Sequence, residues 1–507
     1  MKISDVINNS MNIIRPVFAS KDLHVTSIEY DSRKVAYGSL FVAVEGFESD
    51  GHSFIESAIN KGCKSIIISE SRLDDFSYLS DRGISILVSE NTRRGLSIAS
   101  SIFYGYPSKR LHVTGITGTN GKTSITYLLE SIYSAAGFSC GVIGTVNYRW
   151  KDKVFDAQNT TPESKDIHEL LSLMLRDGVT HVILEISSHA LELNRADDIE
   201  LNSAIFTNLT RDHLDFHKTF DAYFNAKKRL FDILERSHKL NKTAVINIDD
   251  EFGRKIYNAK DKYSFAINSF ALKDGADITA LDNSIEDKIT GLKYTLNCED
   301  KSYDISLKLA GKFQVYNSLA AFGSAYYSGI AGDTAVQGMN NLQAVPGRLQ
   351  VVESPSGFYA VIDYAHTSDA LLKLLQSIKG MPHEKLITVF GCGGDRDKTK
   401  RPIMFKAALE YSDIVIVTSD NPRTEDPLLI IKDIISEMSD GDCIIEPDRE
   451  KGIALAISKA SRGDIIVIAG KGHEDYQIIG KEKSHFDEHE IVEELTGGAL
   501  YGKAHNS

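Results

Sequence analysis

Residues 111–137 read LHVTGITGTNGKTSITYLLESIYSAAG. An apolar segment that favours a strand leads into a glycine-rich loop, and a segment with helical spacing follows the loop. Glycines let backbone N–H groups close around phosphate oxygens, and the helix N-terminus adds the positive end of its dipole. Lys122 supplies a charge for the β- and γ-phosphates, and Thr123 offers a hydroxyl to Mg²⁺. We therefore predict a nucleotide-binding loop made of Thr117, Gly118, Thr119, Asn120, Gly121, Lys122 and Thr123.

The loop departs from the general phosphate-binding pattern G-x-x-x-x-G-K-[ST]. Ile116 stands at the first glycine position, with Gly115 and Gly118 close by. The competing interpretation is a glycine-rich turn with a solvated lysine. We prefer phosphate binding because a strand segment precedes the loop and a helix segment follows it.

Strand and helix segments alternate along most of the chain. Short apolar runs typical of strands occur at 39–44, 65–69, 180–186, 204–207, 244–247, 359–363, 386–390, 413–417 and 464–469. Helical spacing appears between them, for example at 53–61. This alternation predicts a mostly parallel sheet covered on both faces, whereas residues 270–304 favour antiparallel strands.

Two breaks divide the chain. A Gly/Pro/Ser/Lys stretch lies at 104–110, and Pro346-Gly347-Arg348 opens the last block. The length of 507 residues is also that of about three domains. We predict an α/β protein with a small N-terminal domain (1–108), a central domain with a mostly parallel sheet (109–345) and a C-terminal domain (346–507).

Composition excludes several classes of protein. Hydrophobic residues make up 42% and charged residues 25%, as in ordinary soluble proteins. The net charge of −13 argues against binding nucleic acid or an anionic membrane by bulk charge. Five scattered cysteines without a C-x-x-C pair indicate reduced thiols. Residues 1–20 lack the apolar core of a signal peptide, and no apolar run approaches the ~20 residues of a membrane helix. We therefore expect a cytoplasmic protein.

Three further segments of the central block carry residues suited to metal chemistry. Glu185 ends a strand, where a carboxylate can hold Mg²⁺, although a plain strand-end turn is the preferred interpretation for this segment alone. His213 lies in the dense polar segment 208–217, which fits a metal site or a helix cap equally well. Lys227 lies in a helix, and the residues alone favour a surface lysine there.

Polar or glycine-rich segments follow four strands of the last block: DYAHT, GCGGDRDK, TSDNPR and GKGHE. Ligands of open α/β sheets bind beyond the carboxyl ends of the strands. Arg396, Arg423 and Glu474 there would suit the carboxylate and ammonium groups of an amino acid. The alternative is a set of surface turns with salt-bridged arginines.

Eleven segments together resemble the Mur ligase family, and most closely its MurE type. They occur in family order along nearly the whole chain, and most are weak signals singly. The segments are DSRKVAYGSLFVAVEG, TGITGTNGKTS, NTTPES, EISSHALELNR, TNLTRDHLDFHKTFDAYFNAKKRLF, VINIDD, GRLQ, DYAHTSDAL, GCGGDRDKTKRP, TSDNPRTEDP and AGKGHEDYQ.

The resemblance implies a UDP-sugar-binding N-terminal domain, a central P-loop-type ATP-binding domain and a C-terminal Rossmann-like, amino-acid-binding domain. It implies an ATP-dependent acid–amino-acid ligase of peptidoglycan synthesis, and hence a part in cell-wall biogenesis, cell shape and cell division. The enzyme would add meso-diaminopimelate to UDP-N-acetylmuramoyl-L-alanyl-D-glutamate through an acyl phosphate. Its partners would be these small molecules, ATP and Mg²⁺, with no nucleic acid and no membrane insertion, and we expect a monomer.

The resemblance also assigns roles to residues in the first two domains. Catalytic roles fall on Lys122, Glu185, His213 and Lys227. Mg²⁺ ligands would be Thr123, Glu185, His213 and Lys227, the last as a carbamate, which replaces the surface-lysine interpretation. Nucleotide contacts besides the loop are Asn317, Arg348 and Asp363. Contacts to the UDP-sugar dipeptide are Tyr30, Ser32, Asn159, Thr160, Thr161, Ser187 and Arg195.

The amino-acid pocket would contain Arg396, Asp420, Asn421, Pro422, Arg423, Gly470 and Glu474. The DNPR segment resembles the diaminopimelate-adding subtype, in which an arginine grips the second carboxylate. Three positions depart from the family pattern: Leu193, Gln314 and Thr399.

Other functions remain open from the sequence. The same ligase could add L-lysine or L-ornithine. A folylpolyglutamate-synthetase-like ligase shares the central chemistry, but it should lack the N-terminal domain and the DNPR segment. A nucleotide-binding protein without turnover is a further alternative, disfavoured because the acidic, histidine and lysine positions are all present.

Overall fold

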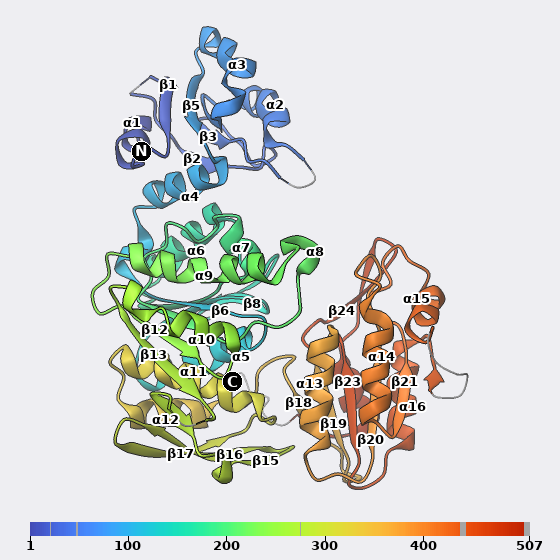
Figure 1. The fold of residues 1–507 in the computed structure, drawn as a ribbon. Helices are drawn as coiled ribbons and strands as arrows, with labels where there is room; N and C mark the ends of the chain where they lie inside the picture. The colour runs from blue at the N-terminus through green and yellow to red at the C-terminus, as the bar shows by residue number, and fades with distance from the viewer. Residues whose placement is uncertain (21, 47–48, 274, 437–442, 501–507) are drawn as a thin grey trace.

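The computed structural model describes residues 1–20, 22–46, 49–273, 275–436 and 443–500. Within these residues the chain forms three sheet-containing units, with the N-terminal unit at the top of Figure 1, the central unit below it and the C-terminal unit to the right. The predicted α/β class with a mostly parallel central sheet is confirmed. The predicted boundaries after residues 108 and 345 fall between the sheets and stay predictions.

The N-terminal sheet has the strand order β1-β5-β4-β3-β2, and all its neighbours pair in parallel except β1 with β5. Its strands are β1 (Arg15–Phe18), β2 (Ser27–Glu29), β3 (Ser39–Val42), β4 (Ser65–Ser69) and β5 (Ser85–Ser89). The helices are α1 (Ile3–Asn9), α2 (Ile55–Asn60), α3 (Leu73–Phe76) and α4 (Thr92–Phe103). Helix α4 packs against α6 of the central unit and so joins the two units.

The central sheet has a parallel middle and antiparallel ends. Strands β14-β13-β12-β11-β6-β10-β7 run parallel, while β8, β9, β15, β16 and β17 pair antiparallel. The antiparallel strands expected within 270–304 are therefore confirmed for β15–β17, but the expectation is wrong for the pairing of β14 with β13, which is parallel. The strands are β6 (His112–Thr117), β7 (Cys140–Ile143), β8 (Asn147–Trp150), β9 (Lys153–Asp156), β10 (His181–Glu185), β11 (Ser203–Phe206), β12 (Thr243–Asn247), β13 (Ala266–Ala271), β14 (Ile278–Ala280), β15 (Glu286–Lys288), β16 (Gly291–Cys298) and β17 (Lys301–Leu307).

Helices cover both faces of this sheet because successive strand residues point to opposite sides. Ile183 of β10 packs with the helices of one face, and its neighbours Val182 and Leu184 pack with the helices of the other. One face carries α5 (Lys122–Ala135), α11 (Phe313–Tyr327) and α12 (Gly332–Asn341). The other carries α6 (Ser164–Arg176), α7 (Ser188–Glu192), α9 (Phe220–Arg236) and α10 (Glu251–Tyr257), with the short α8 (Leu214–His217) before α9.

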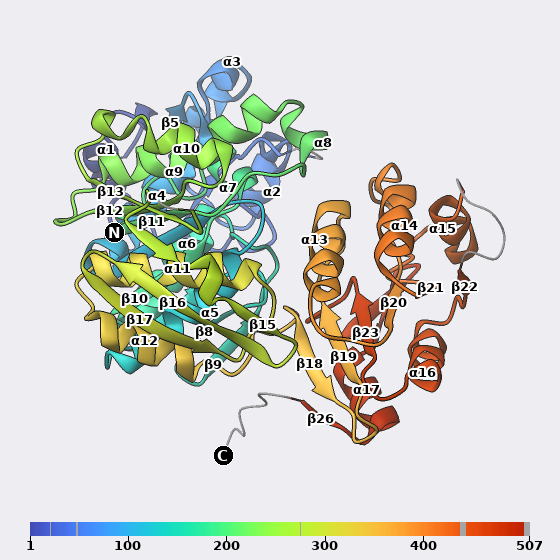
Figure 2. The same ribbon diagram turned by 60° about the horizontal axis from the view of Figure 1, so that its bottom comes forward.

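The C-terminal sheet has the order β22-β21-β20-β23-β19-β18-β26, parallel from β22 to β19. Its strands are β18 (Gln350–Glu353), β19 (Tyr359–Asp363), β20 (Leu386–Phe390), β21 (Ile414–Val417), β22 (Ile444–Ile445), β23 (Ile465–Ala469) and β26 (Ala499–Leu500), with a separate hairpin of β24 (Tyr476–Ile479) and β25 (Glu482–His485). Figure 2 shows β18 on the side of this sheet that faces the central unit.

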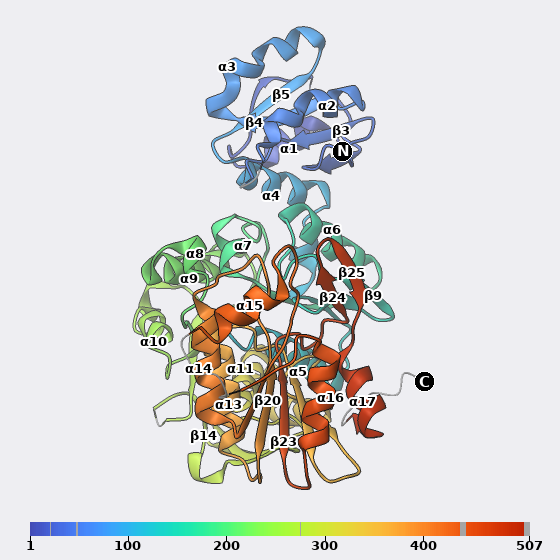
Figure 3. The same ribbon diagram turned by 90° about the vertical axis from the view of Figure 1, so that its right-hand side faces the viewer.

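Figure 3 shows the two helical layers of the C-terminal unit. Helices α13 (Ser368–Lys379), α14 (Lys400–Tyr411) and α15 (Pro427–Ile434) cover one face. Helices α16 (Arg449–Lys459) and α17 (Glu488–Thr496) cover the other. No helix in the described part of the chain is long and apolar enough to cross a membrane, and no disulfide joins the described cysteines.

One buried histidine makes the stability of the fold pH-dependent. His168 of α6 is fully buried, and neither ring nitrogen has a hydrogen-bond partner. Burial lowers the pKa of His168 to about 3, whereas an unfolded histidine has a pKa of about 6.5. Between these two pH values the unfolded state binds more protons, so stability falls as the pH falls.

We expect His168→Leu to reduce this acid sensitivity, because leucine fills the site without a titrating group. Thermal unfolding at pH 7 and pH 5 measures the effect. The loss of Tm between the two pH values should be smaller in the variant than in the wild type. An equal loss would show that His168 does not contribute to the pH dependence.

Candidate active site

The glycine-rich loop between β6 and α5 is tightly packed between two neighbouring segments. A Cβ atom on Gly118 would lie 1.8 Å from the Thr207 hydroxyl, and one on Gly121 would lie 2.3 Å from the Asn317 amide oxygen. Both glycines have positive φ, 149° and 92°. Glycine is therefore required at both positions, for space as well as for conformation.

Lys122 begins α5 and bends back over the loop. Its Nζ donates to the carbonyl oxygens of Gly118 and Thr119, each at 2.9 Å. Burial lowers the pKa of Lys122, while the charges of Glu185 and Asp212 act in the opposite direction. The amine thus lies inside the loop, where a bound phosphate could replace the carbonyls as its partner.

Glu185 is the last residue of β10 and is only 1% exposed. Its carboxylate accepts hydrogen bonds from the Thr145 N–H (3.0 Å), the Thr145 hydroxyl (2.8 Å) and the Thr123 hydroxyl (3.2 Å). A Cβ on Gly144 would lie 2.4 Å from Glu185 Oε1, so the chain passes very close to the carboxylate. Sequence reasoning missed Gly144 and Thr145, although both directly follow the parallel strand β7 and so reach the same sheet edge.

Lys227 is buried, which corrects the interpretation from the residues alone as a surface lysine. It is 1% exposed, because α9 turns this face toward the sheet, and its Nζ lies 4.6 Å from the centre of the Tyr223 ring. Burial first, and the charge of Lys122 second, lower the pKa of Lys227 well below that of an ordinary lysine.

His213 precedes α8 in a left-handed backbone conformation, with φ 53°. Its Nε2 lies 3.4 Å from an Asp212 oxygen, and its ring is 4.7 Å from that of His189. The His213 side chain is 43% exposed. Partial burial lowers the pKa of His213 to about 4, and the charges of Lys122 and Lys227 contribute to the lowering.

The predicted dipeptide contacts gather beside Glu185, with Asn159 more exposed than the others. The Thr161 hydroxyl donates to the Glu185 carbonyl oxygen at 2.8 Å and accepts from the Ser187 N–H at 3.0 Å. Arg195 donates to the Thr161 carbonyl oxygen at 3.0 Å. Thr160 contacts the Thr145 hydroxyl at 3.1 Å, and the Asn159 carbonyl oxygen accepts from Tyr148.

Tyr30 and Ser32 follow β2 of the N-terminal unit. The Tyr30 hydroxyl donates to Asp166 of α6 at 2.7 Å, and burial raises the pKa of this tyrosine. The Ser32 carbonyl oxygen accepts from Lys61 at 2.9 Å. Tyr30 thus helps to fix the N-terminal unit on the central one.

The predicted nucleotide contacts from the domain junction reach the loop to different degrees. Asn317 lies against Gly121 and donates to Gln314 at 2.8 Å. Arg348 donates to the Thr123 hydroxyl at 3.4 Å. Asp363, whose pKa is raised by burial, accepts from the N–H groups of residues 349 and 365 and so holds the segment next to Arg348.

Asp369 in the first turn of α13 is a second link between the units, and sequence reasoning missed it. Its Oδ2 accepts from the Thr210 hydroxyl at 2.9 Å and from the Asn120 side chain at 3.3 Å. Its position two residues after the DYAHT segment was the available signal. These bonds place the N-terminal end of α13 beside the glycine-rich loop.

The predicted amino-acid residues form one cluster at the carboxyl edge of the C-terminal sheet. The Asn421 side chain donates to Glu474 at 2.9 Å. Lys471, which sequence reasoning missed, is fully buried and donates to both Asn421 (3.2 Å) and Glu474 (3.3 Å). Asp420 Oδ1 is buried without a hydrogen-bond partner and lies 3.8 Å from the Lys471 amine. Gly470, at φ 127°, leaves room beside the other oxygen of Asp420.

The two predicted arginines both lie close to Gly393, and Arg396 is exposed. A Cβ placed there would be 2.9 Å from Arg423 Nη1 and 3.8 Å from Arg396 Cγ. Arg423 donates to the Gly394 carbonyl oxygen at 2.9 Å and follows the buried Pro422. The cluster therefore contains the carboxylates of Asp420 and Glu474, with the two arginines on the loops beside Gly393.

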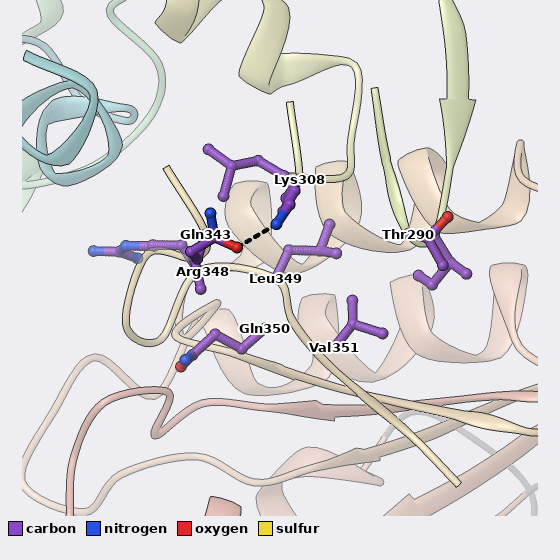
Figure 4. Close-up of a pocket in the computed structure, with 10 residues that line it drawn as sticks. Thr290, Lys308, Gln343, Arg348, Leu349, Gln350 and Val351 are labelled. Atoms are coloured by element: carbon purple, nitrogen blue, oxygen red, sulfur yellow. Dashed lines mark hydrogen bonds between the residues drawn. The ribbon is translucent and has the colours of Figure 1, made fainter. Parts of the chain in front are cut away.

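A small gap at the junction of the central and C-terminal units is shown in Figure 4. Residues of β18 and of the segment before it line one side, and Lys308 is hydrogen bonded to Gln343 on the other. Its cavity volume of about 10 Å³ is near the minimum that holds one water molecule. The gap is therefore a feature of domain packing and no substrate site.

Family models match all three units of the chain. They are described as Mur ligase family, catalytic domain (residues 24–97), Mur ligase middle domain (116–325), and Mur ligase, glutamate ligase domain (347–472). The chain belongs to the Mur ligase family. The predicted resemblance is thus confirmed, and with it an ATP-dependent ligase.

Two bacterial members of the Mur ligase family illustrate the similarity. Both are named UDP-N-acetylmuramoyl-L-alanyl-D-glutamate--2,6-diaminopimelate ligase. The protein from Clostridium perfringens is 43% identical, over 94% of this chain and 96% of the relative. The protein from Clostridium tetani is 40% identical, over 98% and 99%.

Solved structures of Mur ligases share the fold. A structure titled as the same 2,6-diaminopimelate ligase has a TM-score of 0.70 at 32% identity, covering 98% of this chain and 99% of the other. A folylpolyglutamate synthase from Mycobacterium tuberculosis, bound to ADP and AMPPCP, has a TM-score of 0.61 at 18% identity, covering 73% of this chain and 91% of the other. At 18% identity that likeness concerns the fold alone.

Gly118→Ala tests the packing of the loop. The added Cβ would meet Thr207, so we expect kcat/KM for ATP to fall by about 100-fold or more, because a small displacement of a catalytic loop is costly. Gly105→Ala is the matched control, since Gly105 also has positive φ (75°) but meets no atom within 4 Å. It should cost about 1–2 kcal/mol of stability and leave kcat/KM unchanged. Equal kinetics for both variants would contradict the steric argument.

Proposed function

We propose that this protein is the ATP-dependent ligase that joins meso-diaminopimelate to UDP-N-acetylmuramoyl-L-alanyl-D-glutamate in peptidoglycan precursor synthesis. The observation that carries the proposal is the match to relatives named for this reaction over nearly their whole length. The two side-chain clusters of the structure support it, because one suits a nucleotide and the other an amino acid with an additional carboxylate. A cytoplasmic location and a role in cell-wall biogenesis, cell shape and division follow from the proposal.

The reaction needs ATP because a carboxylate is a poor acylating agent, whose leaving group would be oxide. Transfer of the terminal phosphoryl group of ATP to the D-glutamate side-chain carboxylate forms an acyl phosphate and releases ADP. The amine of the incoming amino acid then attacks the acyl carbon, and inorganic phosphate leaves as the amide bond forms. Each step brings anions together, so positive charge must be supplied.

In this proposal the glycine-rich loop binds the phosphates of ATP. The backbone N–H groups of residues 121–123, at the N-terminus of α5, would face the phosphate oxygens, whereas the N–H groups of Thr119 and Asn120 donate to Asn208 and hold the loop in place. Lys122 exchanges its bonds to the loop carbonyls for the β- and γ-phosphates. Arg348, already 3.4 Å from the Thr123 hydroxyl, adds a second cation from the C-terminal unit.

The donors around Glu185 fit Mg²⁺, which the family implies. A buried carboxylate with a threonine hydroxyl 3.2 Å away offers the hard oxygen ligands that this ion prefers. The ion would be held by Thr123, Glu185, His213 and Lys227 as a carbamate, and when bound it would neutralise phosphate charge. Within the described chain no three His, Cys, Asp or Glu side chains are grouped so that they could hold a metal ion.

The environment of Lys227 supports carbamate formation. Only a neutral amine can add to CO₂, and burial beside a second amine keeps the pKa of Lys227 low. Addition forms an N–C bond and releases a proton, which converts a potential cation into an anion with two oxygen ligands. The nearby Lys122 then becomes a favourable partner.

The dipeptide end of the substrate would lie beside Thr160, Thr161, Ser187 and Arg195, next to Glu185. The uridine end would extend toward Tyr30 and Ser32. At the other side of the site, Asp420 and Glu474 would receive the ammonium group of the amino acid. Arg396 and Arg423 would bind its distal carboxylate.

A panel of amino acids decides between the proposed function and its nearest alternative, the addition of L-lysine or L-ornithine. Purified protein with Mg²⁺, ATP and the UDP-dipeptide should release phosphate with meso-diaminopimelate at the highest kcat/KM. A higher kcat/KM with L-lysine or L-ornithine would show that the protein is the ligase that adds that amino acid. No release with any diamino acid would refute a ligase of this pathway.

Lys227→Ala tests the buried lysine, with the adjacent Lys228→Ala as the control. We expect the first variant to lose about 100-fold or more in turnover, in the range seen when a group that stabilises developing charge is removed. The second should keep wild-type turnover. Bicarbonate or a short carboxylate should partly restore Lys227→Ala by occupying the vacated space. Full activity of Lys227→Ala would contradict the role of Lys227.

A further inference from the structure

Two loops at the carboxyl edge of the C-terminal sheet carry the two arginines of the amino-acid cluster. The 391–399 loop follows β20 and contains Arg396, and the 418–426 loop follows β21 and contains Arg423. The loops approach very closely, because the Gly394 N–H donates to the Asn421 carbonyl oxygen at 2.9 Å. A Cβ on Gly394 would lie 1.9 Å from the Pro422 carbonyl oxygen.

Each loop contains one residue in the left-handed backbone region. Asp395 has φ 54° and Arg423 has φ 52°. Such conformations cost about 1–3 kcal/mol each and persist where surrounding contacts enforce them. One such contact is the Asp395 carboxylate, which accepts from the Thr424 N–H at 3.1 Å and from its hydroxyl at 2.8 Å.

An ion pair connects the two loops, with Arg401 fully buried and Glu425 17% exposed. Arg401 of α14 is 0% exposed, and its two Nη atoms donate to the two oxygens of Glu425 at 2.9 and 3.1 Å. Arg401 also donates to the Gly393 carbonyl oxygen at 3.3 Å, and Glu425 accepts from the Asp395 N–H at 2.6 Å. The hydrogen bonds from Arg401 are the main reason that the pKa of Glu425 falls to about 2, so the pair stays charged.

We propose that Arg401 and Glu425 form a clamp that presets the two loops and so determines the preference for a diamino acid with a distal carboxylate. The inference rests on the proposed function. A bidentate grip on a carboxylate requires fixed guanidinium positions, and the clamp holds residues next to both Arg396 and Arg423. Arg401 does not itself bind the ligand, because Glu425 and Asp433 (2.7 Å) compensate its charge. Both members of the pair are positioning residues.

A second ion pair, between the first residues of α16 and α17 in the same unit, provides a matched comparison. Arg449 and Glu488 are both fully buried and lie 2.6 Å apart. Arg449 donates to the carbonyl oxygens of Ser419 (3.1 Å) and Ala469 (2.9 Å), which directly precede Asp420 and Gly470. This pair therefore supports the carboxylate end of the cluster, which every amino acid would use.

The test compares Arg401→Lys with Arg449→Lys in the full-length enzyme. Lysine keeps the charge but cannot bridge two oxygens and a carbonyl as the guanidinium does. A phosphate-release assay gives kcat and KM for meso-diaminopimelate. The same assay, with L-lysine varied up to high concentrations, gives kcat/KM for L-lysine. We expect Arg401→Lys to raise KM for diaminopimelate by about 10- to 100-fold, because the arginines that bind the distal carboxylate would be misplaced. The kcat at saturating diaminopimelate and KM for ATP should stay nearly unchanged. In Arg401→Lys, kcat/KM for the substrate L-lysine should change little. Arg449→Lys should instead lower kcat/KM for both diaminopimelate and L-lysine.

Two further variants separate positioning from stability. Asp433→Asn removes the partner of Arg401 that touches neither loop, so it should lower Tm without changing KM for diaminopimelate. Glu425→Gln should raise that KM in the same direction as Arg401→Lys, and it replaces Arg401→Lys if that variant does not fold. The inference is overturned if KM for diaminopimelate stays within about twofold of wild type in both clamp variants, or rises equally in Asp433→Asn. Wild-type enzyme inactive with every diamino acid would instead refute the proposed function.

Discussion

Burial of the Lys122 and Lys227 amines is the constraint on which the central site depends, and at Lys227 the charge of Lys122 adds to the effect of burial. Both amines lie in an environment that penalises ions, so the pKa of each is lowered. The Glu185 carboxylate, whose charge acts on Lys122, is held by threonine hydroxyls and an N–H group, and Asp212 acts on both lysines. The site therefore has positive charge to offer and favours ligands that bring negative charge, such as the phosphates of a nucleotide.

The two mostly parallel sheets determine where the candidate site residues lie. The glycine-rich loop, Gly144 and Glu185 follow adjacent parallel strands of the central sheet, so they meet at one edge. The amino-acid cluster is built in the same way from the ends of β20, β21 and β23. Asp369 and Arg348 then connect the two edges by direct hydrogen bonds. Both groups of residues thus lie beyond the carboxyl ends of parallel strands, where open α/β sheets bind their ligands.

Two ion pairs of the C-terminal unit, each with a fully buried arginine, support different parts of the amino-acid cluster. Arg449 and Glu488 hold the strand ends that carry the carboxylates, while Arg401 and Glu425 hold the loops that carry the guanidinium groups. Breaking such a pair leaves an uncompensated buried charge, which is strongly unfavourable. These ion pairs therefore fix the positions of the loops after β20 and β21, which are short and polar and would not keep one conformation without them.

The sequence by itself determined the alternation of strands and helices, the glycine-rich loop and the acidic strand end at Glu185, because these are local patterns read within a few residues. It could not show that Lys227 is buried, since a helical lysine has the same local signature on either face. It also missed Thr145, Lys471 and Asp369, whose partners are distant in the chain. Only the tertiary structure decided which face of α9 meets the sheet and which loops meet at its edge, because burial and the resulting pKa shifts depend on neighbours that local sequence does not specify.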